Sequence, residues 1–287
     1  MRVLVIGAEG QLGKDVLAEL GPLVADAPPH ADLDITDETR VSERISRIKP
    51  DVVINLSAFH DVPTCEKRPH TAFEVNTLGP RYVARACRAN GAGFFHISTD
   101  YVFDGRKGEP YEEDDLTGPM MIYGATKLAG EYLALAEWEQ TYILRTTGLF
   151  GSNPCRAKPG GRNFVETMLH LGRTRGKVDV VSDVFCCPTY SKDLARQLAT
   201  LSTDPPAPGV YHVVSPPGCS WMEFARMIFS AAGLEEVKVT PVSSGASPAL
   251  FRRPADSRLA IRKIGKSGRS VMRPLKEAIE DYMRRRD

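Results

Sequence analysis

The chain has 287 residues, of which 42% are hydrophobic and 25% are charged, as in a folded globular protein with one large domain or two unequal lobes. Its net charge of +1 gives no electrostatic reason to expect nucleic acid or an acidic membrane surface as a partner. No apolar run is long enough to span a bilayer, and Met1 leads into a β-rich run without a signal peptide. Six cysteines lack the spacing of zinc sites. We therefore expect reduced thiols, no bound metal and a cytoplasmic protein.

The first predicted strand leads into a glycine-rich turn. Residues 3–6 form a short apolar run typical of a buried parallel strand, and a helical pattern follows the turn. Strand, glycine turn and helix form the context of a dinucleotide-binding turn, in which the backbone approaches the pyrophosphate and the helix N-terminus faces the phosphates. The three-residue spacing of the glycines differs from the commoner G-x-G-x-x-G, and a plain turn is the alternative. The expected cofactor-binding residues here are Gly7, Gly10, Gln11, Leu12 and Gly13.

A second strand is expected over residues 23–25, and it ends at Asp26. An acidic residue at this point usually accepts hydrogen bonds from the adenine ribose and disfavours a 2′-phosphate. No arginine follows Asp26 closely in the sequence, so the pattern favours NADH without excluding NADPH. The alternative is a turn aspartate before Pro28. A helix is then expected to begin within residues 33–37, with Thr36 as its N-cap.

Two later strands carry small and polar residues to one edge of the expected sheet. Residues 51–58 form a strand that ends in small residues suited to packing against a cofactor, and residues 94–98 form a strand that leads to Thr99. Ligands of open parallel sheets bind at the carboxyl edge. We therefore expect the glycine turn, both strand ends and the next helix to meet at one crevice. His96 lies inside the second strand, and we expect it to be a packed core histidine.

The helix expected over residues 122–138 carries Tyr123 and Lys127 on one face, one turn apart. A phenol normally holds its proton until about pH 10. A neighbouring ammonium favours the phenolate and lowers that pKa, which would let Tyr123 donate a proton to a carbonyl. The Thr99 hydroxyl could hold the same carbonyl oxygen, so Thr99, Tyr123 and Lys127 are candidate catalytic residues. The alternative is an ordinary amphipathic helix with an aromatic side chain inward and a charge outward.

These motifs together resemble the dTDP-4-dehydrorhamnose reductase family of extended short-chain dehydrogenases/reductases. The resemblance covers most of the chain, and its most specific phrases are Ser98 to Gly105 and Tyr123 to Glu131. It implies an α/β fold with a Rossmann-type doubly wound parallel sheet and a smaller C-terminal α/β substrate lobe over the crevice. The implied NAD(P)-binding domain is 1–150, with 176–203 returning to it, and the implied substrate lobe is mainly 151–175 and 204–287.

The resemblance also implies NADPH- or NADH-dependent reduction of the 4-keto group of a 4-keto-6-deoxy nucleotide sugar, with dTDP-4-dehydro-L-rhamnose first among the substrates. Hydride would pass to C4 of the sugar while Tyr123 protonates the oxygen and Lys127 holds the nicotinamide ribose. Whether the chain forms a homodimer stays open. The other implied cofactor contacts are Asp34, Ile35, Ser57, Ala58, Phe59, His60 and Asn76, and the implied substrate contacts are Thr99, Asp100, Gly148 and Arg253.

Three departures from the family pattern fall on the expected substrate side. Gly148 stands where the family carries a tryptophan that lines the sugar site, Val62-Pro63 replaces a Val-Asp phrase, and 183–186 replaces an Asp-Gln-x-Gly segment. The catalytic and cofactor sets are intact, which suggests retained hydride chemistry and an altered substrate. Gly148 predicts a pocket that is either wider or filled by another side chain, with His60 and the Pro- and Gly-rich loop 152–163 as candidates.

Two other functions compete with reduction of that sugar. One is a non-catalytic, dinucleotide-binding regulatory subunit, since such subunits resemble the same reductases. The intact Thr99, Tyr123 and Lys127 set favours an enzyme, because a binding subunit has no need of all three. The other is a dehydratase or epimerase of the same family. A dehydratase normally needs an added acid/base pair beside the threonine, and Asp100-Tyr101 stands where Asp-Glu would be.

Overall fold

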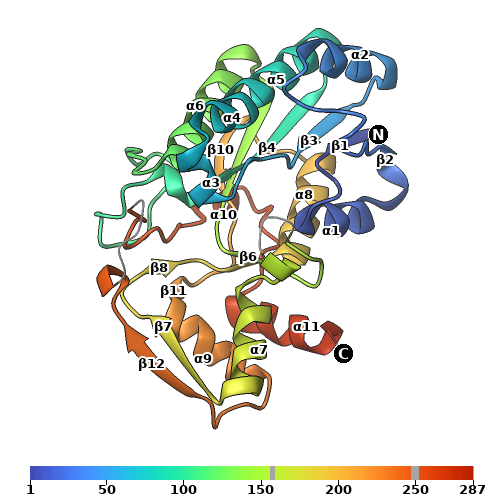
Figure 1. Ribbon diagram of the computed structural model, residues 1–287. Coiled ribbons are helices and arrows are strands. Elements are labelled where there is room, and N and C mark those ends of the chain that lie inside the picture. The colour runs from blue at the N-terminus through green and yellow to red at the C-terminus, as the bar shows by residue number, and fades with distance from the viewer. Residues whose placement is uncertain (156–158, 247–251, 287) are drawn as a thin grey trace.

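A parallel sheet forms the centre of the computed structural model, which describes residues 1–155, 159–246 and 252–286 (Figure 1). Its strand order is β10-β5-β4-β3-β1-β2, and every neighbouring pair is parallel. The chain order runs outward in both directions from β1, so the switch point of the topology lies between β1 and β3. The strands are β1 (Val3–Ile6), β2 (Val24–Asp26), β3 (Val52–Asn55), β4 (Gly93–Thr99), β5 (Thr141–Thr146) and β10 (Gly209–His212).

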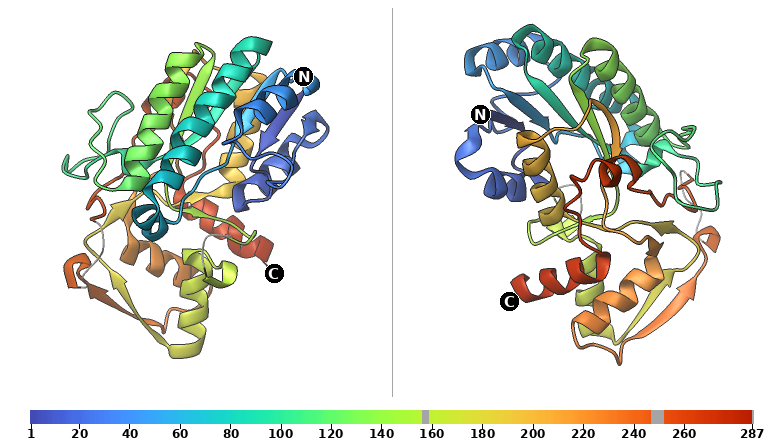
Figure 2. Two further views of the ribbon diagram at one scale, coloured as in Figure 1. Left: turned by 45° about the horizontal axis from the view of Figure 1, so that its top comes forward. Right: turned by 180° about the vertical axis from the view of Figure 1, so that it is seen from behind.

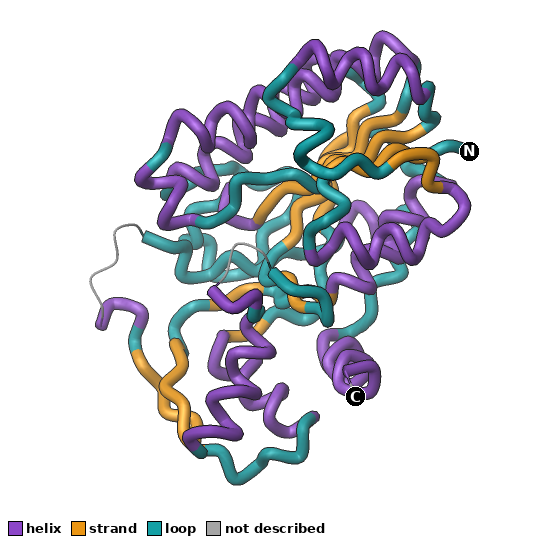
Figure 3. Tube along the Cα trace, turned by 45° about the vertical axis from the view of Figure 1, so that its right-hand side comes forward, coloured by secondary structure: helices purple, strands orange, loops and turns teal. Residues whose placement is uncertain are grey.

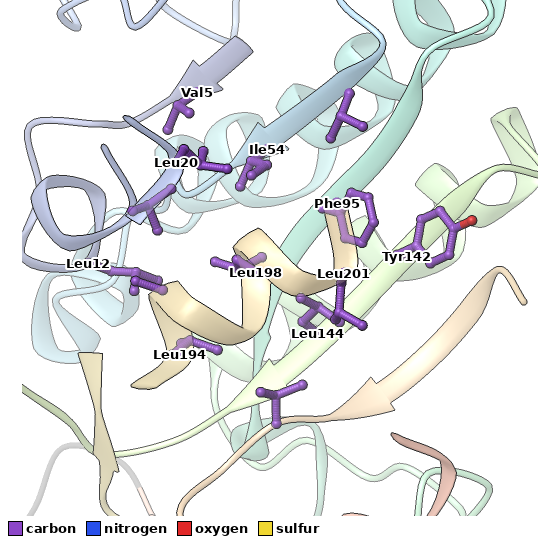
Figure 4. Packing of buried hydrophobic residues seen from close by; sticks show 14 of the residues in the cluster. Val5, Leu12, Leu20, Ile54, Phe95, Tyr142, Leu144, Leu194, Leu198 and Leu201 are labelled. Carbon is purple, nitrogen blue, oxygen red and sulfur yellow. The ribbon is translucent and has the colours of Figure 1, made fainter. Parts of the chain in front are cut away.

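Helices cover both faces of this sheet (Figure 2). Successive strand side chains point to opposite faces, so Val3 and Val5 face one helical layer while Leu4 and Ile6 face the other. Burial on both faces explains why the central strands read as continuous apolar runs. The first layer is α1 (Gln11–Leu20) and α8 (Ser191–Thr203), whose leucines pack on the strands (Figure 4). The second is α2 (Glu38–Ile48), α5 (Gly79–Asn90) and α6 (Ile122–Glu137).

The connection from β3 to α5 is broken into short pieces rather than forming part of one helix. Asp61 caps the first piece by accepting a hydrogen bond from the backbone N–H of Thr64. The last piece is a π-helical turn that contains Asn76, and such turns are frequent at functional sites. Gly130 of α6 lies directly against this turn, because a Cβ there would be 2.2 Å from the Asn76 carbonyl oxygen. The pieces are α3 (Val62–Lys67), α4 (Pro69–Phe73) and the π-helical turn Glu74–Leu78.

A smaller lobe lies below the sheet in the view of Figure 1, and Figure 3 shows its helices from the side. It has its own core, in which Phe150, Phe224 and Tyr282 are buried. Its strand pairs are β7 (Lys177–Val181) with β12 (Lys238–Val242), β8 (Phe185–Cys186) with β11 (Cys219–Ser220), and β6 (Leu149–Phe150) with β9 (Thr189–Tyr190). Its helices are α7 (Phe164–Arg175), α9 (Trp221–Ala231) and α11 (Leu275–Arg286); α10 (Arg262–Lys266) packs against β10. The 3₁₀ turns of the chain are Gly21–Leu23, Asp100–Val102, Pro159–Gly161 and Ser244–Ala246.

The sheet pairings divide the chain differently from the expected boundaries. Within the expected returning segment 176–203, β7 pairs with β12 outside the central sheet, while α8 packs against α1. The next strand, β10, was expected in the substrate lobe with 204–287 and instead pairs with β5 as an edge strand of the central sheet. Short β-rich runs look alike in sequence, and long-range pairing decides which sheet each one joins.

The described residues contain neither a membrane-spanning helix nor a cluster of metal ligands. In the ranges given above, no helix is long and apolar enough to cross a bilayer. No group of three or more His, Cys, Asp or Glu residues in that part of the chain could hold a metal ion. All six cysteines are free thiols, and five of them are buried.

Candidate active site

The glycine turn lies at the switch point of the sheet. Gly7 follows β1 with a φ of 80°, and a Cβ there would be 2.8 Å from the backbone nitrogen of Ser57 at the end of β3. Gly13 brings α1 against the turn, because a Cβ there would be 2.4 Å from the carbonyl oxygen of Ala8. Gly10 precedes α1, and no described side chain caps that helix N-terminus. The first N–H groups of α1 are therefore available to a ligand.

Gln11 gives this turn a second donor. Its side chain is buried, and its Nε2 atom has no hydrogen-bond partner among the described residues. A buried amide donor without a partner is costly unless a ligand satisfies it. Leu12, the next residue, faces the core between α1 and the sheet. The turn therefore fits the pyrophosphate of a dinucleotide, with backbone N–H groups and the Gln11 amide as donors.

Asp26 forms an ion pair that the sequence did not predict. Arg44 of α2 donates to both of its carboxylate oxygens, from Nε at 2.5 Å and from Nη2 at 3.0 Å. The sequence showed no arginine close to Asp26, but the fold brings one from the next helix. A guanidinium at this point suits a 2′-phosphate. The pair therefore weakens the preference for NADH that Asp26 alone indicated.

Asn76 holds the segment after β3 and is itself fully buried. Its Oδ1 accepts from the backbone N–H of Phe59 at 2.8 Å, and its Nδ2 donates to the carbonyl oxygen of the same residue at 2.9 Å. The same Nδ2 lies 3.2 Å from Oγ1 of Thr126 on α6. Asn76 therefore fixes the expected cofactor segment through its backbone, and its own amide is occupied by protein groups.

The remaining expected cofactor residues lie in two loops at the ends of β2 and β3. Asp34 accepts from the backbone N–H and the hydroxyl of Thr36, both at 2.9 Å. Ile35 is buried, and a Cβ on Gly79 of α5 would be 2.5 Å from it. His60 is exposed, with its Nδ1 3.3 Å from the carbonyl oxygen of Ala58. These contacts shape the loops, and they leave Ser57 and Ala58 at the carboxyl end of β3 as expected.

Tyr123 and Thr99 are brought together at the carboxyl edge of β4. The Thr99 hydroxyl hydrogen-bonds to the Tyr123 phenol, and the Tyr101 ring stands edge-on to the Tyr123 ring at 6.2 Å. Burial raises the pKa of Tyr123, the charge of Asp100 raises it further, and the Thr99 hydrogen bond opposes both. The expectation that this pKa is lowered is therefore wrong for this state of the protein. The phenol keeps its proton, as a proton donor must.

Lys127 lies under the same edge and is 1% exposed. Its Nζ donates to the carbonyl oxygen of Ile97 at 2.6 Å and lies 2.9 Å from Nε2 of His96. Burial lowers its pKa to about 7, and the charge of Glu131 opposes that shift. The lowered pKa weakens the positive charge that Lys127 was expected to place beside Tyr123.

Asp100 joins the two lobes. Its buried carboxylate accepts from the Thr99 hydroxyl at 3.0 Å, from the Ser257 hydroxyl at 2.5 Å and from the Thr147 side chain. Burial raises its pKa to about 6, and the three hydroxyl groups oppose the rise. Neither Ser257 nor Thr147 was predicted as a partner of Asp100 from the sequence. The Asp100 carboxylate therefore accepts hydrogen bonds from three hydroxyl groups of the protein itself.

Gly148 was expected on the substrate side, and an aromatic side chain lies beside it. Its φ is 56°, and a Cβ there would be 3.2 Å from Cα of Pro188 and 3.6 Å from Cη2 of Trp221. The filling group is therefore Trp221 of α9, rather than His60 or the loop 152–163, of which residues 156–158 lie outside the described residues. Sequence reasoning missed Trp221, although it is one of only two tryptophans in the chain.

Arg253 completes the described substrate side. It is exposed, and its positive charge lowers the pKa of Tyr101, whose overall shift is upward because of burial and the charge of Asp100. Arg253, Tyr101 and Asp100 therefore lie at the same part of the crevice, close to Tyr123. A guanidinium in that position suits a phosphate group of a nucleotide sugar.

Comparisons with known proteins agree with this geometry. The model of the family described as RmlD substrate binding domain matches residues 1–287. The chain belongs to this family. It is 39% identical over 289 residues to the spore coat polysaccharide biosynthesis protein SpsK of Bacillus subtilis (strain 168), with 99% of this chain and 98% of the relative covered. It is 36% identical over 276 residues to the dTDP-4-dehydrorhamnose reductase of Aggregatibacter actinomycetemcomitans, with 92% of each covered.

Solved structures of the same family have the same fold. A dTDP-4-dehydrorhamnose reductase of Clostridium acetobutylicum superposes with a TM-score of 0.91 at 37% identity, and 99% of each chain is covered. The dTDP-4-dehydrorhamnose reductase of Bacillus anthracis, in complex with NADP, has a TM-score of 0.91 at 36% identity and the same coverage. The resemblance drawn from the motifs and the Rossmann-type fold are thereby confirmed.

Proposed function

We propose that this protein is an NAD(P)H-dependent reductase of the 4-keto group of a 4-keto-6-deoxy nucleotide sugar, with dTDP-4-dehydro-L-rhamnose as its first candidate substrate. The observation that carries the proposal is the placement of the Tyr123 phenol in hydrogen-bond contact with Thr99 at the carboxyl edge of the sheet, with Lys127 one turn further along α6. Relatives of 36% identity named dTDP-4-dehydrorhamnose reductase support the substrate class.

The residues of the crevice divide the chemistry between them. The bound cofactor supplies the hydride, and the glycine turn with the Gln11 amide holds its pyrophosphate. The Thr99 hydroxyl, which donates to Asp100 in the free protein, would turn to donate its hydrogen bond to the carbonyl oxygen of the sugar. Tyr123 gives its proton to that oxygen as the carbonyl carbon is reduced, so one hydride and one proton convert the ketone to an alcohol. Because the phenol starts protonated, the site is prepared for reduction.

The same proposal includes NADPH as a cofactor beside NADH. Arg44 at the Asp26 carboxylate supplies a cation where a 2′-phosphate would lie. The Bacillus anthracis relative in complex with NADP supports this choice. We place the protein in the cytoplasm, where its six free thiols would stay reduced.

We further propose that a second copy of the chain covers an apolar groove beside α6. Phe73 is 46% exposed at this groove, whose volume is about 530 Å³, and Tyr132 of α6 is 57% exposed. Replacing Phe73 with Glu should convert a dimer to a monomer in light scattering, and a wild-type monomer would refute the proposal. The groove is lined by Pro69, His70, Phe73, Glu74, Leu78, Ile122, Ala125 and Thr126.

A turnover assay tests the reductase. The protein is incubated with NADPH or NADH and a panel of 4-keto-6-deoxy sugars linked to dTDP or UDP, and cofactor oxidation and the sugar product are measured. We expect turnover of the dTDP-linked sugar. Turnover of a different sugar alone would assign an altered substrate to the pocket beside Trp221. Cofactor binding without turnover of any sugar would contradict the reductase and favour a regulatory subunit.

A further inference from the structure

A buried ion pair lies between helix α6 and the carboxyl ends of two strands of the central sheet. The Glu131 carboxylate of α6 accepts from Nη2 of Arg145 at 2.7 Å and from Nε of the same side chain at 3.1 Å. Its Oε1 also accepts from the hydroxyl of Ser98. The Glu131 and Arg145 side chains are 1% and 4% exposed, so bulk water does not compete for these hydrogen bonds.

The ion pair joins the two elements that carry the candidate catalytic residues. Glu131 lies about two turns beyond Tyr123 on α6. Ser98 directly precedes Thr99 on β4, and it stands opposite Arg145 in the pairing of β4 with β5. One set of hydrogen bonds therefore ties the helix that holds the Tyr123 phenol to the strand that holds the Thr99 hydroxyl.

Stability alone does not account for a buried ion pair. Removing two charges from water is costly, and apolar side chains of similar volume often stabilise a fold as well or better. The pair adds fixed geometry, because the planar guanidinium of Arg145 matches both oxygens of a carboxylate. Its Cζ lies 5.1 Å from the centroid of the Phe103 ring, and its Nη1 has no hydrogen-bond partner among the described residues. Among those residues, Glu131 is the acceptor that orients the guanidinium.

The other polar contacts of α6 hold the helix in different ways. Thr126, in the first part of α6, accepts from Nδ2 of Asn76 at 3.2 Å, which ties the helix to the segment after β3. Nζ of Lys127 donates to the carbonyl oxygen of Ile97 at 2.6 Å, through a long side chain with four carbons. The Glu131 carboxylate differs from both, because it binds side chains of β4 and β5 at once.

We propose that Glu131 and Arg145 are positioning residues that hold the Tyr123 phenol within hydrogen-bond distance of the Thr99 hydroxyl. The effect on catalysis rests on the proposed reductase, in which both hydroxyl groups must reach one carbonyl oxygen. A displacement of about 1 Å can cost about 10²-fold in rate, so a small shift of α6 along β4 is enough to slow proton transfer. The pyrophosphate site does not depend on the pair, because the glycine turn lies between β1 and α1.

Two substitutions that keep both charges test the geometry. Glu131→Asp shortens the carboxylate side chain by one methylene, and Arg145→Lys replaces the planar fork with a point charge. We expect each to lower kcat by about 10- to 100-fold and to leave the dissociation constant of NADPH within about threefold of wild type. If charge alone mattered, both variants would keep the wild-type kcat, and that result would overturn the proposal.

The control is Glu137→Asp, the same change in another ion pair of α6. Glu137 accepts from Nε of Arg81 and from Nη2 of Arg85, both at 2.8 Å, and so ties α6 to α5 rather than to a strand. This variant should keep the wild-type kcat. A loss of kcat equal to that in Glu131→Asp would mean that any weakened contact of the helix has the same effect, and it would refute the positioning role.

An apolar variant separates position from stability. Combining Glu131→Met, Arg145→Met and Ser98→Ala removes both charges and the hydroxyl that would otherwise lose its acceptor. The protein should unfold at a denaturant concentration close to or above that of wild type. Its kcat should still fall by at least ~10-fold. A stable triple variant with wild-type kcat would contradict the proposal, and this variant carries the test if Arg145→Lys fails to fold.

Crystal structures of the wild type and of Glu131→Asp, both without substrate, test the positional claim independently of the proposed function. We expect Oγ1 of Thr99 and Oη of Tyr123 to lie within about 3.5 Å in the wild type and farther apart in the variant. An unchanged separation would overturn the positioning role even if the wild type reduces the sugar. If the wild type reduced no sugar, the proposed function would fail, whereas a changed separation would still support the positioning role.

Discussion

On the cofactor side of the crevice, the glycine turn is one short motif and two of the other contacts join residues fewer than 20 positions apart, whereas on the expected substrate side the contacts join segments far apart. Gly7 and Gly13 stand in one turn, and Asn76 holds Phe59 across 17 residues. Asp100 instead meets Ser257 across 157 residues. A binding motif made of adjacent residues can be recognised in the sequence. Contacts that join the two lobes can change while the cofactor-binding motif stays intact.

Replacing Tyr123 with Phe removes the proposed proton donor. Of the substitutions predicted here, it should lower turnover the most. The phenol is the proposed proton donor, so kcat should fall by at least ~10²-fold while cofactor affinity stays the same. Steady-state kinetics with NADPH and a cofactor titration measure the two effects. Tyr132→Phe is the control, because Tyr132 lies on the same helix, is 57% exposed, and has its hydroxyl 3.2 Å from the hydroxyl of Thr117. Turnover within a few-fold of wild type would remove Tyr123 as the acid.

Gly148→Trp tests whether the substrate side is already filled. We expect a loss of about 1–3 kcal/mol of unfolding free energy and poorer turnover, because the new side chain meets Pro188 and Trp221. Gly233→Trp is the control for backbone strain, since its φ is 64° and no described heavy atom lies within 4 Å of a Cβ there. Denaturant unfolding compares the two. A Gly148→Trp protein that is as stable as the control and gains activity would mean that the pocket is open.

Ser257→Ala removes one hydroxyl from the contact between the lobes. Burial raises the pKa of Asp100 from 3.8 to about 6, so its contribution to stability is present below about pH 4 and is lost as pH rises through 6. Losing a donor to the ionised carboxylate should deepen that loss by about 1–2 kcal/mol above pH 7, with little change at pH 4. Thermal unfolding across this range measures it. Ser267→Ala, which loses only a bond to the Ile264 carbonyl, should show a deficit that does not vary with pH.

Substitutions in the Asp26–Arg44 ion pair should change the preference between NADPH and NADH. This is the smallest effect that we predict. Arg44→Ala should free the carboxylate and shift the NADPH to NADH ratio of kcat/KM toward NADH by up to about tenfold, because it removes a phosphate partner. Asp26→Ala should shift the same ratio toward NADPH. Arg40→Ala, on the same helix and paired with the exposed Asp37, is the control. Equal ratios in all four proteins would mean that the pair does not face the cofactor.

The sequence predicted most of the cofactor side because local patterns determine it. The first strand, the glycine turn and the helix over 122–138 all appear, with the helix ending at Glu137. The N-cap of α2 was placed at Thr36, but Thr36 bonds to Asp34 and the side chain of Asp37 caps the helix. Adjacent Thr and Asp residues both suit a cap, and the sequence alone does not choose between them.

Long-range partners could not be predicted in the same way. Arg44 pairs with Asp26 only because α2 packs beside β2. Trp221 lies beside Gly148 only because the tertiary fold brings α9 to that position. The pKa of Lys127 shows the same limit. Spacing along a helix indicates which residues share a face, but burial lowers the pKa of the amine and the charge of Glu131 opposes that shift.

Transfer of deuterium tests the central claim most directly. The protein is incubated with NADPH deuterated at the reactive carbon of the nicotinamide and with dTDP-4-dehydro-L-rhamnose, and the sugar product is examined by NMR and mass spectrometry. A reductase of the proposed kind places one deuterium at C4 of the sugar, and Tyr123→Phe slows that transfer by at least ~10²-fold. Unlabelled sugar recovered as the ketone, beside tightly bound and unchanged cofactor, would contradict the proposed function and identify a binding protein instead.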